Sequence, residues 1–239
     1  ILVEDKVTKG VILDTDEKID ADIVISNADP MHLYDKMIPR NQQAFTARIK
    51  QKVSKISMGL YVLYFGTQCT YPNVAHHTIW MGARYKELLA DIFDRKILAE
   101  DFSLYLHRPT ATDPSFAPSG CDSFYVLCPV PNLRGAVDWE VEGPLLRDRI
   151  IKALSNSILP NLNSTICSAF YMTPKDFRKN YLSAFGSGFS VAPTFKQSAW
   201  FRFHNKGEGP KNLFLVGAGT HPGAGLPGVI SSAKVVDKM

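Results

Sequence analysis

Apolar and polar residues alternate along the first 29 positions of the chain, which is the pattern of strands that bury one face. This alternation predicts strands over residues 1–3, 7–13 and 19–26, with a polar turn at 14–17. Strands are also predicted where apolar and aromatic residues follow one another with little interruption. Runs of this kind occupy residues 58–65, 102–106, 124–127 and 213–216.

Other segments favour helices. Residues 42–53 are expected to be helical, and Tyr85 begins a segment in which apolar residues recur at intervals of three and four up to Phe93. Pro144 is expected in the first turn of a further helix, because proline is well tolerated there. The apolar face of that helix would consist of Leu146, Ile150, Ile151, Leu154 and Ile158. Residues 229–236 predict a last helix, so the chain is expected to mix helices and strands in an α+β fold.

The composition changes this picture little. The chain has 239 residues, of which 45% are hydrophobic and 21% charged, an ordinary globular balance. Its formal net charge of +4 is small and spread along the sequence, so no nucleic-acid partner is predicted. No apolar run approaches the ~18 residues of a transmembrane helix. The chain starts at Ile1 inside strand-like sequence, and we therefore expect it to be the C-terminal part of a longer protein.

Metal-binding patterns are weak. The four cysteines include no C-x-x-C pair, which favours free thiols in a reducing compartment over a zinc site. They stand at Cys69, Cys121, Cys128 and Cys167. The adjacent pair His76–His77 has no carboxylate cluster near it in the sequence, so we predict that the chain binds no metal.

The segment Gly217-Ala-Gly-Thr-His-Pro-Gly-Ala-Gly-Leu-Pro-Gly228 has the most informative composition of the chain, with five glycines in twelve residues. Its second half matches the dinucleotide-binding pattern G-x-G-x-x-G, but the strand that should precede the pattern ends earlier, at Val216. Too few residues follow for a helix, a turn and a second strand, so the match is misleading. Glycines and a helix N-terminus still suit a flavin ring or a phosphate, since the backbone can approach closely. The alternative is a tight turn that binds no ligand.

The extended segment Asn212–Val229 closely resembles the C-terminal motif of bacterial-type phytoene desaturases, FAD-dependent flavoproteins related to amine oxidases. The resemblance extends over nearly all of the chain. It includes residues 21–29, 99–107, 125–131, 141–149 and 186–205. It implies an amine-oxidase-like architecture in which residues 1–40 and 206–239 belong to a Rossmann-like FAD-binding domain. Residues 41–205 would then form a substrate-binding domain with a mixed sheet.

The same resemblance implies roles for individual residues. Backbone groups of the first half of the motif would approach the pyrophosphate and ribityl chain of FAD: Gly217, Ala218, Gly219 and Thr220. Those of the second half would meet the isoalloxazine ring: Gly225, Leu226, Pro227, Gly228 and Val229. We expect His221 and Arg202 to take part in catalysis or to stabilise the reduced flavin; for His221 the alternative is a hydrogen bond within the turn. Without the family's N-terminal flavin motif, residues 1–239 alone are expected not to retain FAD.

The implied reaction removes hydrogen from C–C single bonds that flank double bonds of phytoene, a hydride passing to flavin and a proton leaving the neighbouring carbon. The implied partners are a long apolar polyene and, as electron acceptor, a quinone or oxygen. We expect the whole protein to lie on the cytoplasmic side of the cell membrane as a peripheral protein, because its substrate resides in lipid. Aromatic residues in the middle of the chain would line the substrate tunnel or fill a core. They are Tyr61, Tyr64, Phe65, Phe102, Tyr105, Phe124, Tyr125, Trp200 and Phe201.

Two positions depart from the family pattern. Ala192 replaces a glutamate, and Phe203 replaces a proline that usually precedes the His204–Asn205 pair. If the missing carboxylate handles a proton, turnover would be slow, altered in the number of steps, or absent. The alternatives are therefore a desaturase or oxygenase of another carotenoid or a C30 analogue, and a non-catalytic flavin- or lipid-binding relative.

Overall fold

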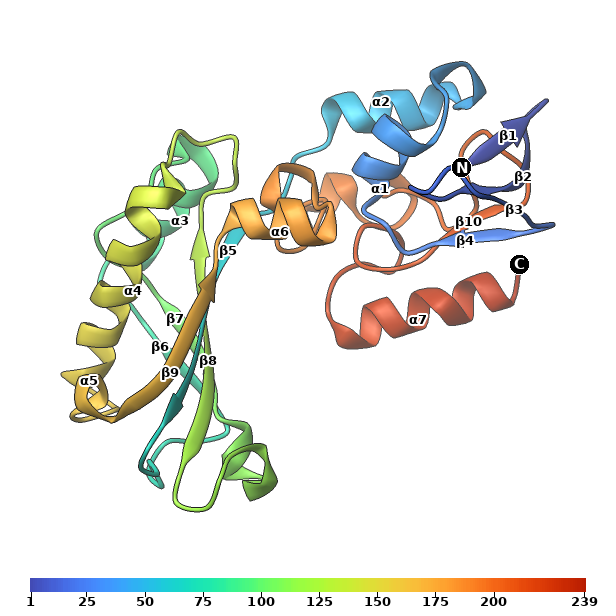
Figure 1. The fold of residues 1–239 in the computed structure, drawn as a ribbon. Coiled ribbons are helices and arrows are strands. Elements are labelled where there is room, and N and C mark those ends of the chain that lie inside the picture. Colours follow the sequence, from blue (N-terminus) through green and yellow to red (C-terminus); the bar gives the residue numbers. More distant parts are fainter. The chain divides into compact units, whose positions relative to one another are not determined.

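Figure 1 shows a computed structural model of the protein, which describes all residues from 1 to 239. The chain divides into two compact units. The flanking unit contains residues 1–57 and 178–239, and the central unit contains residues 58–177. These limits differ from the domain limits after residues 40 and 205 predicted above. Val191 and Phe203 join the same apolar core as Leu33 and Leu215, which places the segment before residue 205 in the flanking unit. The assignment of FAD and substrate binding to particular domains stays a prediction.

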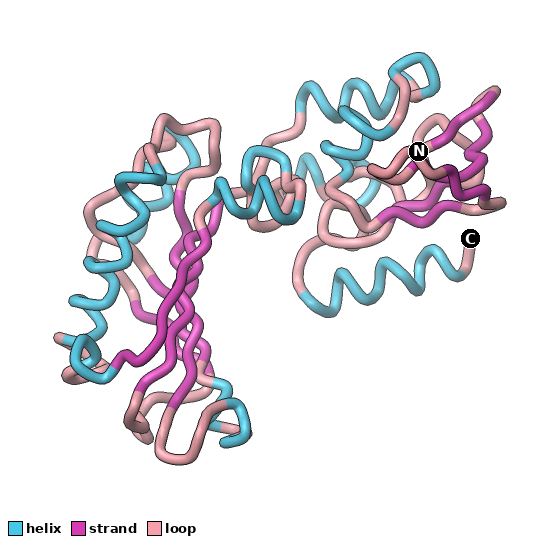
Figure 2. Tube along the Cα trace, in the orientation of Figure 1, coloured by secondary structure: helices cyan, strands magenta, loops and turns pink.

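Helices and strands are interspersed along the chain (Figure 2). The helices are α1 (Pro30–His32), α2 (Phe45–Val53), α3 (Tyr85–Ala90), α4 (Trp139–Ser155), α5 (Leu162–Thr165), α6 (Pro174–Tyr181) and α7 (Leu226–Asp237). The strands are β1 (Leu2–Glu4), β2 (Val7–Ile12), β3 (Lys18–Asp20), β4 (Val24–Ser26), β5 (Gly59–Thr67), β6 (His77–Trp80), β7 (Leu104–His107), β8 (Asp122–Val130), β9 (Ile166–Met172) and β10 (Leu213–Leu215). The predicted α+β fold class is confirmed, since most of the strand pairs are antiparallel.

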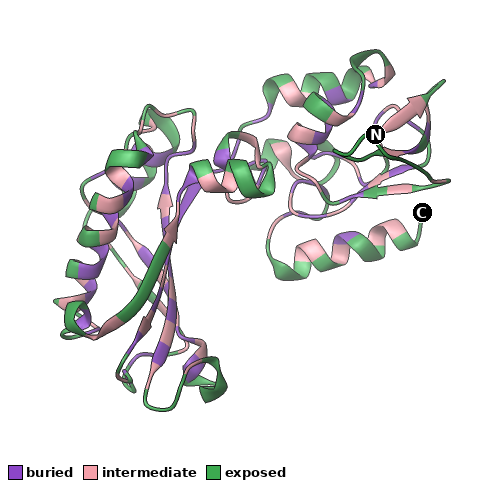
Figure 3. Ribbon diagram, viewed as in Figure 1, coloured by how far each residue is buried: buried purple, intermediate pink, exposed green.

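The central unit is built on a five-stranded antiparallel sheet with the strand order β6-β7-β8-β5-β9. Its long strands alternate between the two faces; in β8 every second residue, from Asp122 to Val130, is buried. Helix α4 packs against one face of the sheet, and the side of the helix that meets the sheet is buried (Figure 3). Tyr61, Leu63 and Leu146 are completely buried in this core.

Helix α4 begins earlier than predicted. We expected Pro144 in its first turn, but the helix starts at Trp139 and contains Pro144 within it. The carboxylate of Asp138 accepts a hydrogen bond from the backbone N–H of Glu140, which caps the true N-terminus. Trp139 is 2% exposed and belongs to the core beneath the helix, so its burial stabilises the extra turn.

The flanking unit contains two small sheets. β1, β2 and β3 form an antiparallel meander, and β4 pairs in parallel with β10 although almost 190 residues separate them in the chain. The apolar core beside these strands includes Leu33, Val191, Phe203 and Leu213. The glycine-rich segment follows the end of β10, one strand of this parallel pair. No helix in the structure is both long enough and apolar enough to span a membrane.

Candidate functional site

The glycine-rich loop, residues 217–225, connects strand β10 to helix α7. The first half of the loop is buried at Gly217, Gly219 and Thr220. It is bonded to α7, because the Gly217 N–H donates to the Ser232 hydroxyl oxygen at 2.9 Å. Ser232 lies on α7 and is itself completely buried. The Thr220 hydroxyl donates to the Gly217 carbonyl oxygen at 3.1 Å, which closes the turn on itself. These hydrogen bonds therefore fix the first half of the loop relative to helix α7.

Arg202 also holds this loop in place. The residue is 2% exposed, and its guanidinium donates to three carbonyl oxygens, those of Thr220 at 3.0 Å, Val191 at 3.2 Å and Ala218 at 2.5 Å. Burial lowers the pKa of Arg202, and the charge of Asp29 opposes that shift. The Arg202 side chain thus holds the main chain of the loop. A catalytic role of Arg202 stays a prediction.

Asn205 joins the same framework. Its side-chain amide donates to the carbonyl oxygens of Leu215, at 3.1 Å, and His221, at 2.8 Å. The side chain of Asn205 is buried, whereas His221 is exposed. The carbonyl of His221 is therefore fixed by the protein and its imidazole faces solvent, where a ligand can reach it. The predicted role of His221 in catalysis is compatible with this position and stays untested.

The second half of the motif differs in character from the first. Gly225, Leu226 and Pro227 are exposed, and Leu226 retains 78% of its accessible surface. Helix α7 begins here without any side chain capping its N-terminus. The first N–H groups of the helix thus lack intrahelical partners and, with the positive end of the helix dipole, point toward solvent.

Two glycines show what each half can accommodate. A Cβ atom on Gly219 would lie 2.3 Å from Cδ of Pro30 and 2.8 Å from the Ser190 hydroxyl oxygen, so packing within the protein already explains that glycine. Gly225 has φ of +98° and nothing within 4 Å of the position where a Cβ would stand. The open backbone around Gly225 is therefore the part of the motif that suits a large planar ligand, because such a ligand can approach without a steric barrier.

The sequence placed these residues correctly in one loop but did not reveal their different environments. The structure brings Arg202 against residues 217–220, while the exposed group at residues 225–227 stands apart at the start of α7. The contributions of Asn205 and Ser232 were missed. The Asn205 amide reaches the Leu215 carbonyl oxygen, ten residues away, and no local pattern in the sequence predicts that contact, so only the fold identifies it.

A second candidate surface lies on the central sheet, on the face opposite α4. Cross-strand partners share a face, and the register aligns a row of rings over all five strands. We call this row the aromatic row; from β9 to β6 it consists of Phe170, Tyr64, Tyr125, His107 and His77. Neighbouring ring centroids lie 4.6, 6.0, 5.1 and 5.3 Å apart along it.

Burial perturbs the titrating groups of this row. Desolvation, followed by the influence of Tyr105, raises the pKa of Tyr125 to about 12, so its hydroxyl stays neutral at ordinary pH. Desolvation, with repulsion from His76 and His77, lowers the pKa of His107. The part of the row from Phe170 to Tyr125 is thus an uncharged, polarizable surface. Of the aromatic residues predicted to line a tunnel or fill a core, Tyr61, Phe65, Phe102 and Phe124 are in the core, whereas Tyr64, Tyr105 and Tyr125 lie on the opposite face. The other two, Trp200 and Phe201, are exposed residues of the flanking unit and belong to neither group.

No protein-family model matches the chain. Among curated proteins, it is 51% identical over 212 residues to the lycopene-forming phytoene desaturase of Pantoea ananas, covering 88% of this chain and 43% of that protein. It is 47% identical over 244 residues to the neurosporene-forming phytoene desaturase of Cereibacter sphaeroides, covering 100% and 47% respectively. The chain therefore spans about half the length of these relatives.

Solved structures show the same fold at low identity. An oxidoreductase from Methanosarcina mazei matches with a TM-score of 0.63 at 16% identity, over 100% of this chain and 48% of that one. A putrescine oxidase variant matches with a TM-score of 0.51 at 9% identity, over 95% and 45%. The predicted amine-oxidase-like architecture is confirmed at the level of the fold. Taken with the identities above, the chain belongs, as a segment about half their length, to the family of bacterial phytoene desaturases.

Proposed function

We propose that the whole protein containing this chain is an FAD-dependent oxidoreductase that desaturates phytoene to lycopene or neurosporene. The observation that carries the proposal is the 46–51% identity to lycopene- and neurosporene-forming phytoene desaturases over 88–100% of the chain. Identity to the 4,4'-diapophytoene desaturase of Methylomonas is lower, at 33%, which favours a C40 over a C30 substrate.

The glycine-rich loop supports flavin binding. The exposed start of α7 and the open space at Gly225 fit a planar ring approaching the helix N-terminus, whose partial positive charge complements the electron-rich edge of a flavin. Once bound, a flavin supplies the hydride-accepting chemistry that protein side chains lack. The part of the protein described here orients the ring: Arg202, Asn205 and Ser232 fix the loop, so that the N–H groups at the start of α7 keep their direction.

The aromatic row supports binding of a polyene. A conjugated or apolar chain offers no hydrogen-bonding groups, so it is recognised by apolar area and by contact with π faces. Phe170 at one end of the row is 61% exposed, and next to it Tyr64 stacks on Phe170 with an interplanar angle of 13°. We infer that the substrate lies along this face of the central sheet.

The location and the electron acceptor belong to the same proposal. A substrate dissolved in lipid favours a peripheral position on the cytoplasmic side of the cell membrane. Reduced flavin then passes its electrons to a quinone or to oxygen. Flotation with liposomes tests the first statement, and anaerobic turnover with and without added quinone tests the second.

The decisive experiment incubates the complete protein with FAD and phytoene in liposomes and separates the carotenoids by chromatography. Products with longer chromophores support the proposal, and their absorption bands count the desaturation steps. Conversion of 4,4'-diapophytoene but not of phytoene would shift the assignment to a C30 substrate. Bound flavin without any new chromophore would refute the desaturase function and favour a non-catalytic relative, in which case Ala192→Glu is the first variant to examine.

Changes in the aromatic row test its role separately. Tyr64→Ala and Phe170→Ala should raise KM for phytoene several-fold, because each removes contact area from the proposed binding face, and flavin content should be unchanged. Phe116, 62% exposed at the short helical turn 114–116, provides the matched control. Equal KM values for Phe116→Ala and both row variants would contradict a substrate on this face.

A further inference from the structure

Three histidines lie together at one edge of the central sheet. His77 is the first residue of β6, His107 is the last of β7, and His76 directly precedes β6. His77 and His107 are direct partners in the antiparallel register, so their side chains share one face. The ring nitrogens with which the three residues can ligate a metal all lie within 4.8 Å of one another. We propose that His76, His77 and His107 form a binding site for a divalent transition-metal ion such as zinc.

Hydrogen bonds to the outer side of the rings support this arrangement. Nδ1 of His77 lies 2.7 Å from the Tyr105 hydroxyl oxygen, and Nδ1 of His76 is hydrogen-bonded to the Thr112 hydroxyl. Partners of this kind orient ligating histidines and select the tautomer in proteins that bind zinc. When Nδ1–H donates to each oxygen, the Nε2 lone pair of each ring is left for the metal.

The spacing requires only a small adjustment. Nε2 of His76 and Nε2 of His107 lie 2.8 Å apart. Two nitrogen ligands of tetrahedral zinc lie about 3.3 Å apart when the Zn–N bonds are about 2.0–2.1 Å. The rings of His76 and His107 thus have to separate by about half an ångström, while His77 keeps the Nδ1 hydrogen bond to Tyr105 that orients its ring. Three side-chain ligands leave the fourth position to water.

The backbone beneath the cluster is held firmly. The Arg108 N–H donates to the His76 carbonyl oxygen at 2.8 Å, which joins the two chain segments that supply the ligands. The Arg108 guanidinium is buried and paired with Asp122, with Nε 2.8 Å from Oδ2. Because this carboxylate neutralises the arginine, the Arg108 charge opposes a bound metal only weakly. A rigid support of this kind favours metal binding, since the ligands need little ordering.

The competing explanation needs no metal. Two neutral imidazoles can share one proton, so an N–H···N hydrogen bond between His76 and His107 accounts for their 2.8 Å contact. The two explanations differ in the role of His77: a hydrogen bond between His76 and His107 does not involve His77, whereas a metal site needs His77 as a ligand. They also differ in zinc affinity, because imidazole groups gathered around one point bind borderline metals more strongly than scattered ones.

The test uses the complete protein without a histidine tag, stripped with a chelator and dialysed against Zn²⁺, with bound zinc counted by elemental analysis. We expect a single tight equivalent in the unmodified protein and in His204→Gln, a histidine of the flanking unit. His77→Gln and His107→Gln should each weaken zinc binding by more than about tenfold, and Tyr105→Phe by about 10–100-fold. Substituted Co²⁺ should give a visible absorption that His77→Gln abolishes.

Melting curves in chelator identify any variant that fails to fold; Tyr105→Phe retains the ring and keeps the test valid if a histidine variant does not fold. The proposal is wrong if the unmodified protein binds no tight zinc. It is equally wrong if His77→Gln binds zinc as tightly as His204→Gln does. Since the readout is zinc content, the result is independent of whether the protein desaturates phytoene.

Discussion

Replacing Arg202 with methionine tests whether its guanidinium holds the glycine-rich loop. The change removes three hydrogen bonds, to the carbonyl oxygens of Val191, Ala218 and Thr220, from a side chain that is 2% exposed. Hydrogen bonds that involve a charged partner contribute about 1.5 kcal/mol or more each, so their loss costs about 4–5 kcal/mol. The apolar side chain also escapes the desolvation of a buried cation, and we expect a net loss of about 2–4 kcal/mol.

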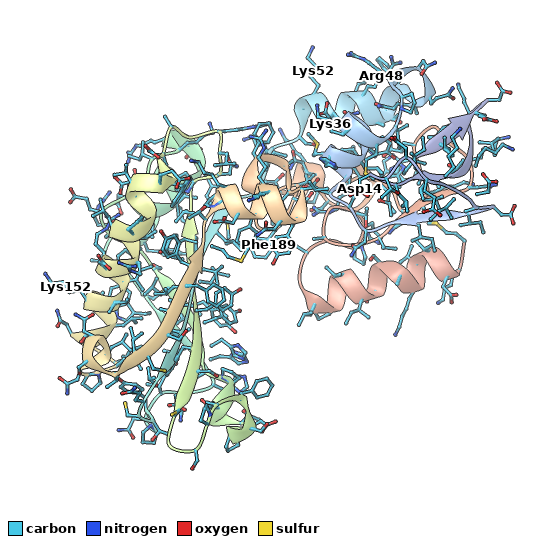
Figure 4. The ribbon with its side chains drawn as sticks, in the orientation of Figure 1. Asp14, Lys36, Arg48, Lys52, Lys152 and Phe189 are labelled. Carbon is cyan, nitrogen blue, oxygen red and sulfur yellow. The ribbon has the colours of Figure 1, made fainter.

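Chemical denaturation of the complete protein measures this loss, with hydrogen exchange of residues 213–220 reporting on the flanking unit alone. Arg48→Met is the matched control, because Arg48 is an exposed residue of α2 that projects from the helix (Figure 4). Its change should cost less than about 0.5 kcal/mol. If Arg202→Met and Arg48→Met lose the same stability, or if residues 213–220 exchange no faster in Arg202→Met, the loop is not held by Arg202.

Three further predictions concern packing, charge and thiol chemistry. Gly219→Ala forces a Cβ to within 2.3 Å of Pro30 and should cost about 1–3 kcal/mol in a denaturation experiment, whereas Gly66→Ala, whose Cβ meets no atom closer than 3.5 Å, should cost almost nothing. Asp122→Ala leaves the Arg108 cation buried without its partner and should lower the free energy of unfolding of the central unit by about 3–5 kcal/mol. A loss below about 1 kcal/mol would contradict the buried ion pair. Burial raises the pKa of the Cys128 thiol to about 12, so at pH 8 an alkylating reagent should modify the exposed Cys167 and spare Cys128, as mass spectrometry of peptides can show.

The raised pKa of Cys128 also fixes the sign of a pH effect. The folded protein binds this proton more tightly than the unfolded chain does, because an unperturbed cysteine thiol has a pKa of about 8.5. The associated stability is therefore fully present below that pKa and is lost as pH rises toward about 12. Cys128→Ala should flatten this alkaline decline, which denaturation at several pH values can measure.

Local patterns predicted the elements that carry their own signature. The apolar run at residues 58–65 and the helical periodicity from Tyr85 correspond to β5 and α3. The strand β9 was missed, because its residues 166–172 are mostly exposed or half-buried and lack a continuous apolar run. The start of α4 was placed too late, since the cap at Asp138 is a weaker signal in sequence than a proline.

The candidate sites show the same division. The glycine content of residues 217–228 predicted the loop, and its position between β10 and α7 confirms the strand and helix predicted around it. The histidine cluster was not predicted: His107 lies thirty residues beyond His77 and joins it only through strand pairing. Long-range register of this kind depends on the packing of the whole sheet, and no local pattern in a single sequence encodes it.

The aromatic row has a consequence for how this sheet tolerates change. Backbone hydrogen bonds, not the rings, set the spacing of the row, since adjacent strands lie about 4.8 Å apart whatever side chains they bear. Exchange of a single ring therefore leaves the others in place. Insertion of one residue directly before Tyr125 would instead turn this tyrosine toward α4 and put the inserted residue in its place, breaking the row at its centre. Natural variation on this face should accordingly consist of substitutions, while lengths of the strands stay constant.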